Sequence, residues 1–193
     1  MRKVVGIHSV EEAIKVRANK IRNIFFKKEY HSSPQLKAVY ELAQEKKLRP
    51  QIISPQELDK ISDGHQGVMV EVTETPEINW NDLESKENCL LIALDGLEDP
   101  QNLGNILRTA WLLGADGILM TENRSVGLTA TVCKIASGGA EHVPVESYNQ
   151  LYDPMRKLKE KGFWIYGLSE KAKSTIWQTQ IHSKAIIVAG SEM

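Results

Sequence analysis

The stretch that decides the fold is Leu94-Asp95-Gly96-Leu97-Glu98-Asp99-Pro100-Gln101-Asn102-Leu103-Gly104-Asn105-Ile106-Leu107-Arg108-Thr109-Ala110. An apolar run from Cys89 to Leu94 leads into it, and apolar residues recur at helical spacing from Ile106 to Leu113. The pattern predicts a buried parallel strand, a polar loop and a helix. Loops at the carboxyl ends of parallel strands are where open α/β sheets bind ligands, because the next helix points its free N–H groups there. We therefore expect the chemistry of the protein in this stretch.

Length and composition suit one or two globular domains, because the chain has 193 residues and 41% of them are hydrophobic. The apolar runs are shorter than the ~20 residues that cross a bilayer, and the first residues lack the apolar segment of a signal peptide. A soluble cytoplasmic protein is the expectation. Cys89 and Cys133 stand far apart in apolar surroundings, so both are interpreted as core residues without a disulfide or metal role.

Charge is distributed unevenly along the chain. Residues 1–75 carry 13 Lys and Arg against 10 Asp and Glu, whereas residues 76–193 carry 11 against 15. One stretch without acidic residues, here called the basic segment, contains Lys15, Arg17, Lys20, Arg22, Lys27 and Lys28. It predicts a face that contacts the phosphates of a nucleic acid. The alternative is a solvated helix end and strand rim, with Phe25 and Phe26 in the core.

The N-terminal part predicts a small three-layer α/β domain over residues 1–74. Ser9 and Glu12 form a capping-box pattern that favours a short first helix. Ser33-Pro34 and Ser54-Pro55 each supply an N-cap and a proline at the first helical position, so two further helices are expected there. The predicted strands are Val4-Val5, Ile21–Phe26, Pro50–Ile53 and Val68–Val72.

The acidic, apolar-poor segment that follows predicts a linker at residues 75–88, packed down by Trp80 and Leu83. From residue 89 to 193 strands alternate with helices, which implies a mostly parallel sheet in a second domain. The predicted strands there are residues 89–94, 117–120, 142–145, 163–168 and 185–189. The predicted helices are residues 106–113, 128–137 and 153–161.

The decisive stretch matches neither of the common phosphate-binding fingerprints. No Gly-Lys-Ser/Thr follows it, and Gly96 and Gly104 are too far apart for Gly-x-Gly-x-x-Gly. It does place Asn102 just before the expected helix and Arg108 about one turn inside it, where a guanidinium can reach a phosphate. The residues alone leave open the alternative of a helix cap and a surface arginine.

Asn102-x-Gly104-x-x-x-Arg108-Thr109-Ala110 after Asp99-Pro100 resembles the first motif of the SpoU-type RNA 2′-O-ribose methyltransferases, of the SPOUT class. The resemblance extends over nearly the whole chain. It is greatest for relatives that act on a guanosine of large-subunit ribosomal RNA. The other matching segments are Gly6 to Ala13, His65 to Val68, Ser137 to Val145 and Gly190-Ser191-Glu192.

This resemblance implies an α/β SPOUT domain with a trefoil knot, S-adenosylmethionine as cofactor, and a homodimer formed through the C-terminal domain. The substrate would be RNA, ribosomal rather than transfer RNA, held by the N-terminal domain through the basic segment. Asn102, Arg108 and Glu192 would be catalytic, without a metal. The cofactor-binding residues would be Gly167, Leu168, Ser169 and Gly190.

Arginine chemistry narrows the expected role of Arg108. The family resemblance implies that this residue orients or activates the ribose 2′-hydroxyl, but a guanidinium keeps its proton and is a poor general base. We therefore expect an electrostatic clamp on the substrate phosphate and the developing oxyanion, a role worth about 3–4 kcal/mol. The five histidines lack metal-ligand spacing.

The family continues beyond its second motif into a third one, rich in Ser, Asn and Val, which closes the knot and covers the adenosine. The sequence ends at Met193, before that motif. We expect either part of a longer chain or a natural short form, and weak or absent binding of S-adenosylmethionine. A catalytically inert, ribosome-associated RNA-binding factor is the alternative function. An oxidoreductase or nucleotide-binding enzyme is disfavoured by the missing phosphate fingerprint.

Overall fold

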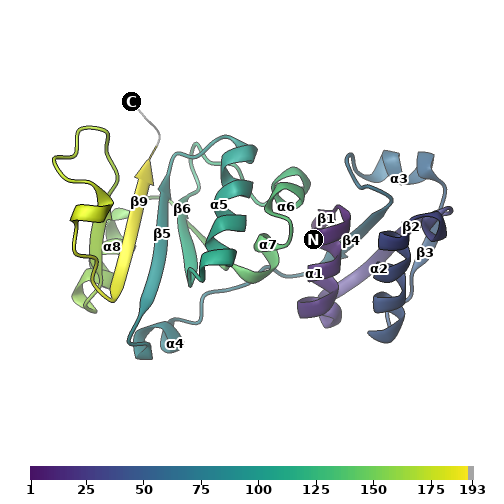
Figure 1. Ribbon diagram of the computed structural model, residues 1–193, viewed down its shortest axis with the longest axis horizontal. Coiled ribbons are helices and arrows are strands. Elements are labelled where there is room, and N and C mark those ends of the chain that lie inside the picture. Colours follow the sequence, from purple (N-terminus) through teal and green to yellow (C-terminus); the bar gives the residue numbers. More distant parts are fainter. Residues whose placement is uncertain (191–193) are drawn as a thin grey trace. The chain divides into compact units, whose positions relative to one another are not determined.

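The computed structural model describes residues 1–190 and forms two compact units (Figure 1). The first unit comprises Met1–Pro76, Pro100–Thr109 and Gly127–His142. The second comprises Glu77–Asp99, Ala110–Val126 and the chain from Val143 onward. Two segments of the C-terminal half are thus part of the same unit as the N-terminal residues.

The first unit contains a sheet of four strands, which are β1 (Arg2–Val5), β2 (Ile21–Lys27), β3 (Gln51–Ile53) and β4 (Val68–Val72). Their order is β1-β4-β2-β3, with β4 antiparallel to both β1 and β2 and with β3 parallel to β2. Since side chains alternate along a strand, the pairing puts Val4 and Val70 on one face and Val5 and Met69 on the other. Both faces are therefore apolar and need a covering layer.

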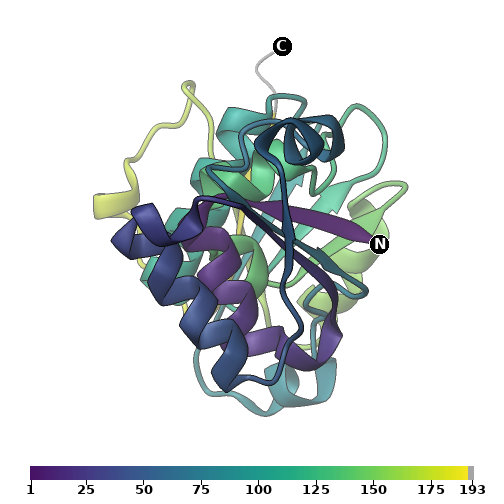
Figure 2. The same ribbon diagram turned by 90° about the vertical axis from the view of Figure 1, so that its right-hand side faces the viewer.

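Helices cover both of these faces, so the predicted three-layer arrangement is confirmed. In α3 (Pro55–Ile61), Leu58 packs with Val5 and Met69. On the other face lies α2 (Pro34–Glu45), whose Tyr40 ring meets Phe26 with centroids 5.3 Å apart. Figure 2 shows α2 beside α1 (Ile7–Arg17). The short turns η1 (Ala18–Lys20) and η2 (Tyr30–Ser32) complete this part.

The two predicted Ser-Pro helix starts are confirmed, and the predicted Ser9 cap is wrong. Ser33 accepts from the Leu36 amide, and Ser54 forms a complete capping box with Glu57. In contrast, α1 begins at Ile7, directly after Gly6, whose φ of +92° is easily adopted only by glycine. Ser9 is buried in the first turn and donates to the Cys133 carbonyl at 2.8 Å. A tertiary contact uses the hydroxyl that the local pattern assigned to capping.

The rest of the first unit is the first ten residues of α5 (Pro100–Leu113) together with α6 (Ala130–Ala136) and α7 (Gly139–His142). Because Pro100 occupies the helix start, which suits proline, α5 begins earlier than the helix predicted at residues 106–113. Asn102 therefore lies inside the first turn instead of preceding the helix. The strand predicted at residues 142–145 is present but begins later, at Val145, since α7 runs to His142.

The second unit contains a sheet in which every neighbouring pair of strands is parallel, as predicted, in the order β7-β6-β5-β9-β8. Its core includes Leu91, Leu119, Phe163 and Ile186. The strands are β5 (Cys89–Asp95), β6 (Gly117–Thr121), β7 (Val145–Tyr148), β8 (Trp164–Gly167) and β9 (Lys184–Gly190). The helical segments are α4 (Trp80–Ser85), α8 (Tyr152–Glu160) and η3 (Ile176–Gln178).

The predicted linker packs as expected, although it contains a helix. Leu83 of α4 is buried in the core of the second unit, and the Trp80 indole donates to Glu146 at 3.2 Å. Both cysteines are free and buried, which confirms their interpretation as core residues, and burial raises the pKa of Cys89 to about 12. Across residues 1–190, no helix has the length and apolar character needed to cross a membrane.

Candidate functional site

The carboxyl ends of the parallel strands in the second unit share one edge of the sheet. The last residue of β9, Gly190, pairs with Asp95 at the end of β5, and Gly167 at the end of β8 pairs with Val188. The Leu168 amide continues this ladder by donating to the Val188 carbonyl at 2.9 Å. Loops that leave this edge are the expected ligand-binding elements of such a sheet.

All four predicted cofactor-binding residues lie together at this edge. Gly167, Leu168, Ser169 and Gly190 line one pocket of about 1030 Å³. A Cβ built on Gly167 would have no neighbour within 4 Å, so the glycine leaves backbone groups open to the pocket. The lining combines exposed apolar side chains such as Ile176 with hydroxyl groups. Apolar walls with a few placed polar groups suit the base and ribose of a nucleoside, so these residues fit S-adenosylmethionine.

The loop that follows β5 is tied to the loop that follows β6. The Gly96 amide donates to Thr121 Oγ1 at 3.0 Å, and this oxygen lies 3.0 Å from Ser125 Oγ. The Val126 amide donates to the Leu97 carbonyl at 2.8 Å. Thr121 is one of few buried polar residues. Sequence reasoning missed this residue, because a threonine at a strand end gives no local signal of its partner.

Removal of the Thr121 hydroxyl should loosen the loop after β5. In Thr121→Val the Gly96 amide loses its acceptor, so we expect unfolding free energy to fall by about 1–2 kcal/mol. Native-state hydrogen exchange should show faster exchange of the Gly96 and Val126 amides, and Thr121→Ser should restore the wild-type rates. Unchanged exchange at Gly96 in the valine variant would contradict this account of the loop.

Asn102 and Arg108 lie on α5 in the first unit, and both side chains are exposed. Among residues 1–190, Arg108 forms no hydrogen bond or ion pair, so its guanidinium is available to a ligand. Asn105 is also exposed and lies three residues from each, on the helix face between them. Because the helix is predicted to begin at residue 106, the sequence does not place Asn105 on this helix face. Glu192, the remaining predicted catalytic residue, lies outside the described residues.

The basic segment divides into paired and unpaired residues. Lys15 contacts Glu11 and Glu12, each at 2.8 Å, and Lys20 contacts Glu74 at 2.7 Å. Arg17 contacts Glu141 and is half-buried. The other three residues have no hydrogen-bonded or ion-paired side-chain partner in the part of the chain that the structure describes; they are Arg22, Lys27 and Lys28. Phe26 is fully buried, as the alternative interpretation of this segment expected.

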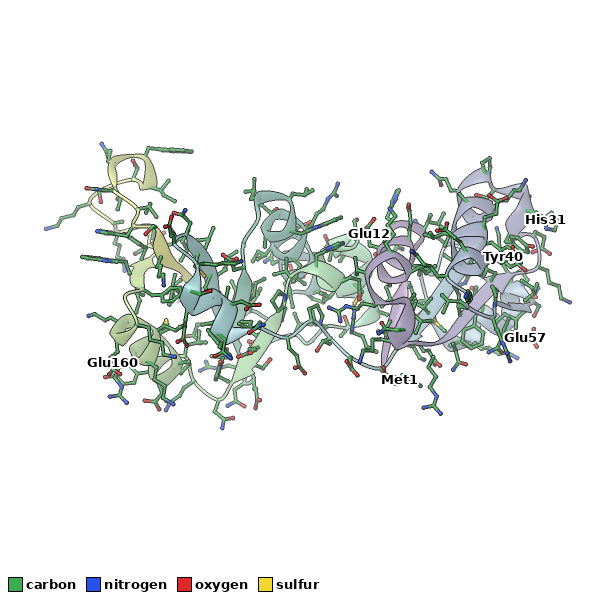
Figure 3. All side chains as sticks on the ribbon, turned by 90° about the horizontal axis from the view of Figure 1, so that it is seen from below. Met1, Glu12, His31, Tyr40, Glu57 and Glu160 are labelled. Atoms are coloured by element: carbon green, nitrogen blue, oxygen red, sulfur yellow. The ribbon has the colours of Figure 1, made fainter. Side chains whose placement is uncertain are left out.

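An aromatic cluster that the sequence analysis did not identify follows these basic residues. The rings of Tyr30 and Tyr40 stack with centroids 4.3 Å apart, and His31 meets Tyr30 edge-on at 5.3 Å. Figure 3 shows His31 and Tyr40 at the same end of the first unit. The stack joins Tyr30 in a turn to Tyr40, ten residues later within α2, so no local pattern reveals it. Aromatic rings beside positive charge suit unpaired RNA bases.

Comparison with known proteins assigns both parts of the chain. The family model "SpoU rRNA Methylase family" matches residues 89–193, and the model "RNA 2'-O ribose methyltransferase substrate binding" matches residues 3–77. The chain belongs to the SpoU family. Members of this family transfer a methyl group from S-adenosylmethionine to a ribose 2′-hydroxyl of RNA, and this chain is such an enzyme. The inert alternative finds no support, and the expected weak or absent binding of S-adenosylmethionine stays a prediction.

Individual SpoU relatives and solved structures agree with this assignment. The chain is 33% identical to 23S rRNA (guanosine-2'-O-)-methyltransferase RlmB of Pseudomonas aeruginosa, over 98% of this chain and 79% of the relative. The RlmB of Haemophilus influenzae is 34% identical with the same coverage. The fold resembles the SpoU methyltransferase AviRb of Streptomyces viridochromogenes, with a TM-score of 0.78, 16% identity, and coverage of 98% of this chain and 71% of AviRb. The predicted SPOUT fold class is confirmed.

Proposed function

We propose that this SpoU methyltransferase modifies a guanosine ribose in large-subunit ribosomal RNA. The observation that carries the proposal is the alignment with two RlmB proteins over 98% of the chain, which includes both the substrate-binding part and the methylase part. In a competition assay with labelled S-adenosylmethionine, unmodified large-subunit ribosomal RNA should be methylated in preference to unmodified transfer RNA. Preferential labelling of transfer RNA would contradict the proposal.

We propose Asn102, Arg108 and Glu192 as the catalytic residues. S-adenosylmethionine, when bound, supplies a methyl group on a positively charged sulfur. Attack by the ribose oxygen mainly requires alignment and compensation of charge. The exposed guanidinium of Arg108 has no partner among residues 1–190, and it would hold the adjacent phosphate and stabilise the negative charge that develops on the 2′-oxygen. Asn102 would orient the nucleotide from the first turn of the same helix.

We propose that Gly167, Leu168, Ser169 and Gly190 hold the cofactor. Gly167→Val places a side chain in the open space of the pocket without meeting protein atoms, so the variant should fold normally. Its dissociation constant for S-adenosylmethionine should rise about tenfold, which corresponds to ~1.4 kcal/mol. Calorimetry on Gly167→Val and on Gly127→Val, a substitution into open space elsewhere, tests this. Equal affinity of both variants would remove this pocket from the proposal.

We propose that the basic segment contacts RNA phosphates mainly through Arg22, Lys27 and Lys28, because acidic partners already compensate Lys15, Arg17 and Lys20. Replacing Arg22 or Lys28 by alanine should each reduce the slope of log affinity against log salt by about one. Lys20→Ala should change it less. Lys159→Ala, an exposed lysine of α8, is the control. If neither Arg22→Ala nor Lys28→Ala changed the slope, this face would be excluded as a contact for RNA phosphates.

The family resemblance implies further properties, which we propose here. We propose an RNA-binding domain at residues 1–74, a linker at 75–88 and a methyltransferase domain from 89 onward, supported by family models that match residues 3–77 and 89–193. We propose a homodimer through the C-terminal domain, supported by the exposed apolar side chains of Trp164 and Leu168. We also propose a trefoil knot and a cytoplasmic location, on the family resemblance alone.

A further inference from the structure

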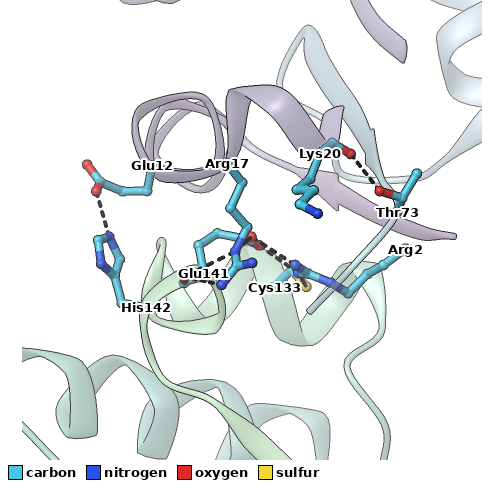
Figure 4. Close-up of polar contacts among 8 residues, drawn as sticks. All are labelled: Arg2, Glu12, Arg17, Lys20, Thr73, Cys133, Glu141 and His142. Carbon is cyan, nitrogen blue, oxygen red and sulfur yellow. Dashed lines mark hydrogen bonds and ion pairs between the residues drawn. The ribbon is translucent and has the colours of Figure 1, made fainter. Parts of the chain in front are cut away.

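A buried carboxylate joins the N-terminal strand to α7 in the first unit. Both Glu141 oxygens accept from the Arg2 guanidinium, at 2.6 and 2.8 Å, and the two side chains are 1% and 9% exposed (Figure 4). Arg17 at the end of α1 donates to the Glu141 carbonyl at 3.3 Å and lies 3.5 Å from its carboxylate. Glu141 thus binds two arginines, Arg2 on the strand before α1 and Arg17 at the end of α1.

The guanidinium of Arg2 keeps its charge in this buried place. Burial by itself would lower the pKa of Arg2, but the hydrogen bonds and charge of Glu141 outweigh it, and the pKa is raised. A buried ion pair of this kind is sensitive to loss of one partner, because the other charge then lies unpaired in a poorly solvated place. The bidentate geometry also fixes the relative orientation of the two groups.

The same short helix, α7, touches α5 on another side. A Cβ on Gly139 would lie 2.6 Å from the Leu107 carbonyl oxygen, which means that the two backbones are in direct contact. The preceding helix α6 makes a similar pair of contacts, since Ser9 donates to the Cys133 carbonyl and a Cβ on Gly104 would lie 2.5 Å from Ile135. The α6–α7 segment therefore connects α1 and β1 directly to the helix that carries Arg108.

His142, the last residue of α7, adds a second polar contact to the same connection. Its Nε2 lies 2.8 Å from Glu12 of α1 (Figure 4). Sequence alone gives no sign of these pairings, because their partners are separated by 139 and 130 residues.

We propose that Glu141 is a positioning residue for methyl transfer. It holds the RNA-binding part of the first unit in a fixed position relative to Asn102 and Arg108 on α5. This inference rests on the proposed function of those residues. RNA bound to the basic segment would then present its target ribose at a set distance from the clamp. A misplacement of about 1 Å in such a site lowers rates by about 100-fold.

Kinetics on large-subunit ribosomal RNA test this role. Glu141→Gln keeps the shape but removes the charge, and its kcat should fall about 10- to 100-fold, while KM for RNA and the affinity for S-adenosylmethionine stay within about twofold of wild type. Glu141→Asp should recover part of kcat. Phe163→Leu, which weakens the core of the second unit, controls for general destabilisation. Assays run well below the melting temperature of every variant. A Glu141→Gln enzyme with lower thermal stability and unchanged kcat would overturn the proposal.

A distance measurement tests the same link without any activity. Spin labels at Ala38→Cys on α2 and Asn105→Cys on α5 occupy exposed positions, and the native cysteines are buried. Double electron–electron resonance measures the distance between the two labels. The distribution of this distance should be narrow in the labelled protein that retains Glu141 and broader in the labelled Glu141→Gln variant. Equally narrow distributions would overturn the inference. If the wild-type protein methylates no ribosomal RNA, the proposed function fails, and the distance measurement alone decides whether Glu141 fixes the register.

Discussion

Replacing Arg108 by alanine should lower kcat for RNA methylation by about 100- to 1000-fold, which corresponds to ~3–4 kcal/mol of transition-state stabilisation. The side chain is exposed and free of protein partners among residues 1–190, so its removal should leave the melting temperature unchanged. The loss would come from the missing clamp on the phosphate and on the developing oxyanion. Methyl transfer to ribosomal RNA, followed at saturating cofactor, measures it.

Two further arginine variants serve as controls for that result. Arg108→Lys keeps the charge but loses the planar fork, so it should recover only part of the rate. Arg156→Ala removes an exposed arginine of α8 and should behave as wild type. If Arg108→Ala retained wild-type kcat and only weakened RNA binding, Arg108 would be an RNA-contacting residue without a catalytic role.

Gly139→Ala should be the most destabilising single substitution considered. The new Cβ would lie 2.6 to 2.9 Å from backbone atoms of Leu107 and Arg108, and backbone cannot rotate away as a side chain can. We expect a loss of about 3 kcal/mol in unfolding free energy, at the upper end of the usual cost of overpacking. Chemical denaturation measures it.

The matched control for Gly139→Ala is Gly127→Ala, because a Cβ at Gly127 has no neighbour within 4 Å. This variant should retain wild-type stability. Should Gly139→Ala be as stable as Gly127→Ala, the close approach of α7 to α5 would be wrong, and with it the structural basis for coupling through Glu141.

The fold was predictable where local residues determine it. Ser33-Pro34 and Ser54-Pro55 fix two helix starts through contacts within one turn, and the apolar run of β5 marks a buried parallel strand. Prediction failed where a contact with a residue distant in sequence determines the local structure. Ser9 donates to the Cys133 carbonyl, far along the chain, and the strand predicted from residue 142 begins only at Val145, because α7 packs against α5 up to His142.

The candidate site likewise has a part that the sequence could predict and a part that it could not. Gly167, Leu168, Ser169 and Gly190 could be brought together from sequence, because they follow two neighbouring parallel strands that end at one edge. That these four residues hold the cofactor stays a prediction. The basic segment is recognisable as a run of charge, but its acidic partners come from elsewhere in the chain, as Glu74 and Glu141 show. Only the structure separates the compensated residues from the uncompensated ones.

The chemical identity of the methylated nucleoside tests methylation of the ribose 2′-oxygen and the role of Arg108 together. Unmodified large-subunit ribosomal RNA is incubated with the protein and S-adenosylmethionine, digested to nucleosides and analysed by mass spectrometry. We expect 2′-O-methylguanosine, formed by the wild-type protein and nearly lost with Arg108→Ala. A nucleoside methylated on the base, or a yield that Arg108→Ala leaves unchanged, would contradict it.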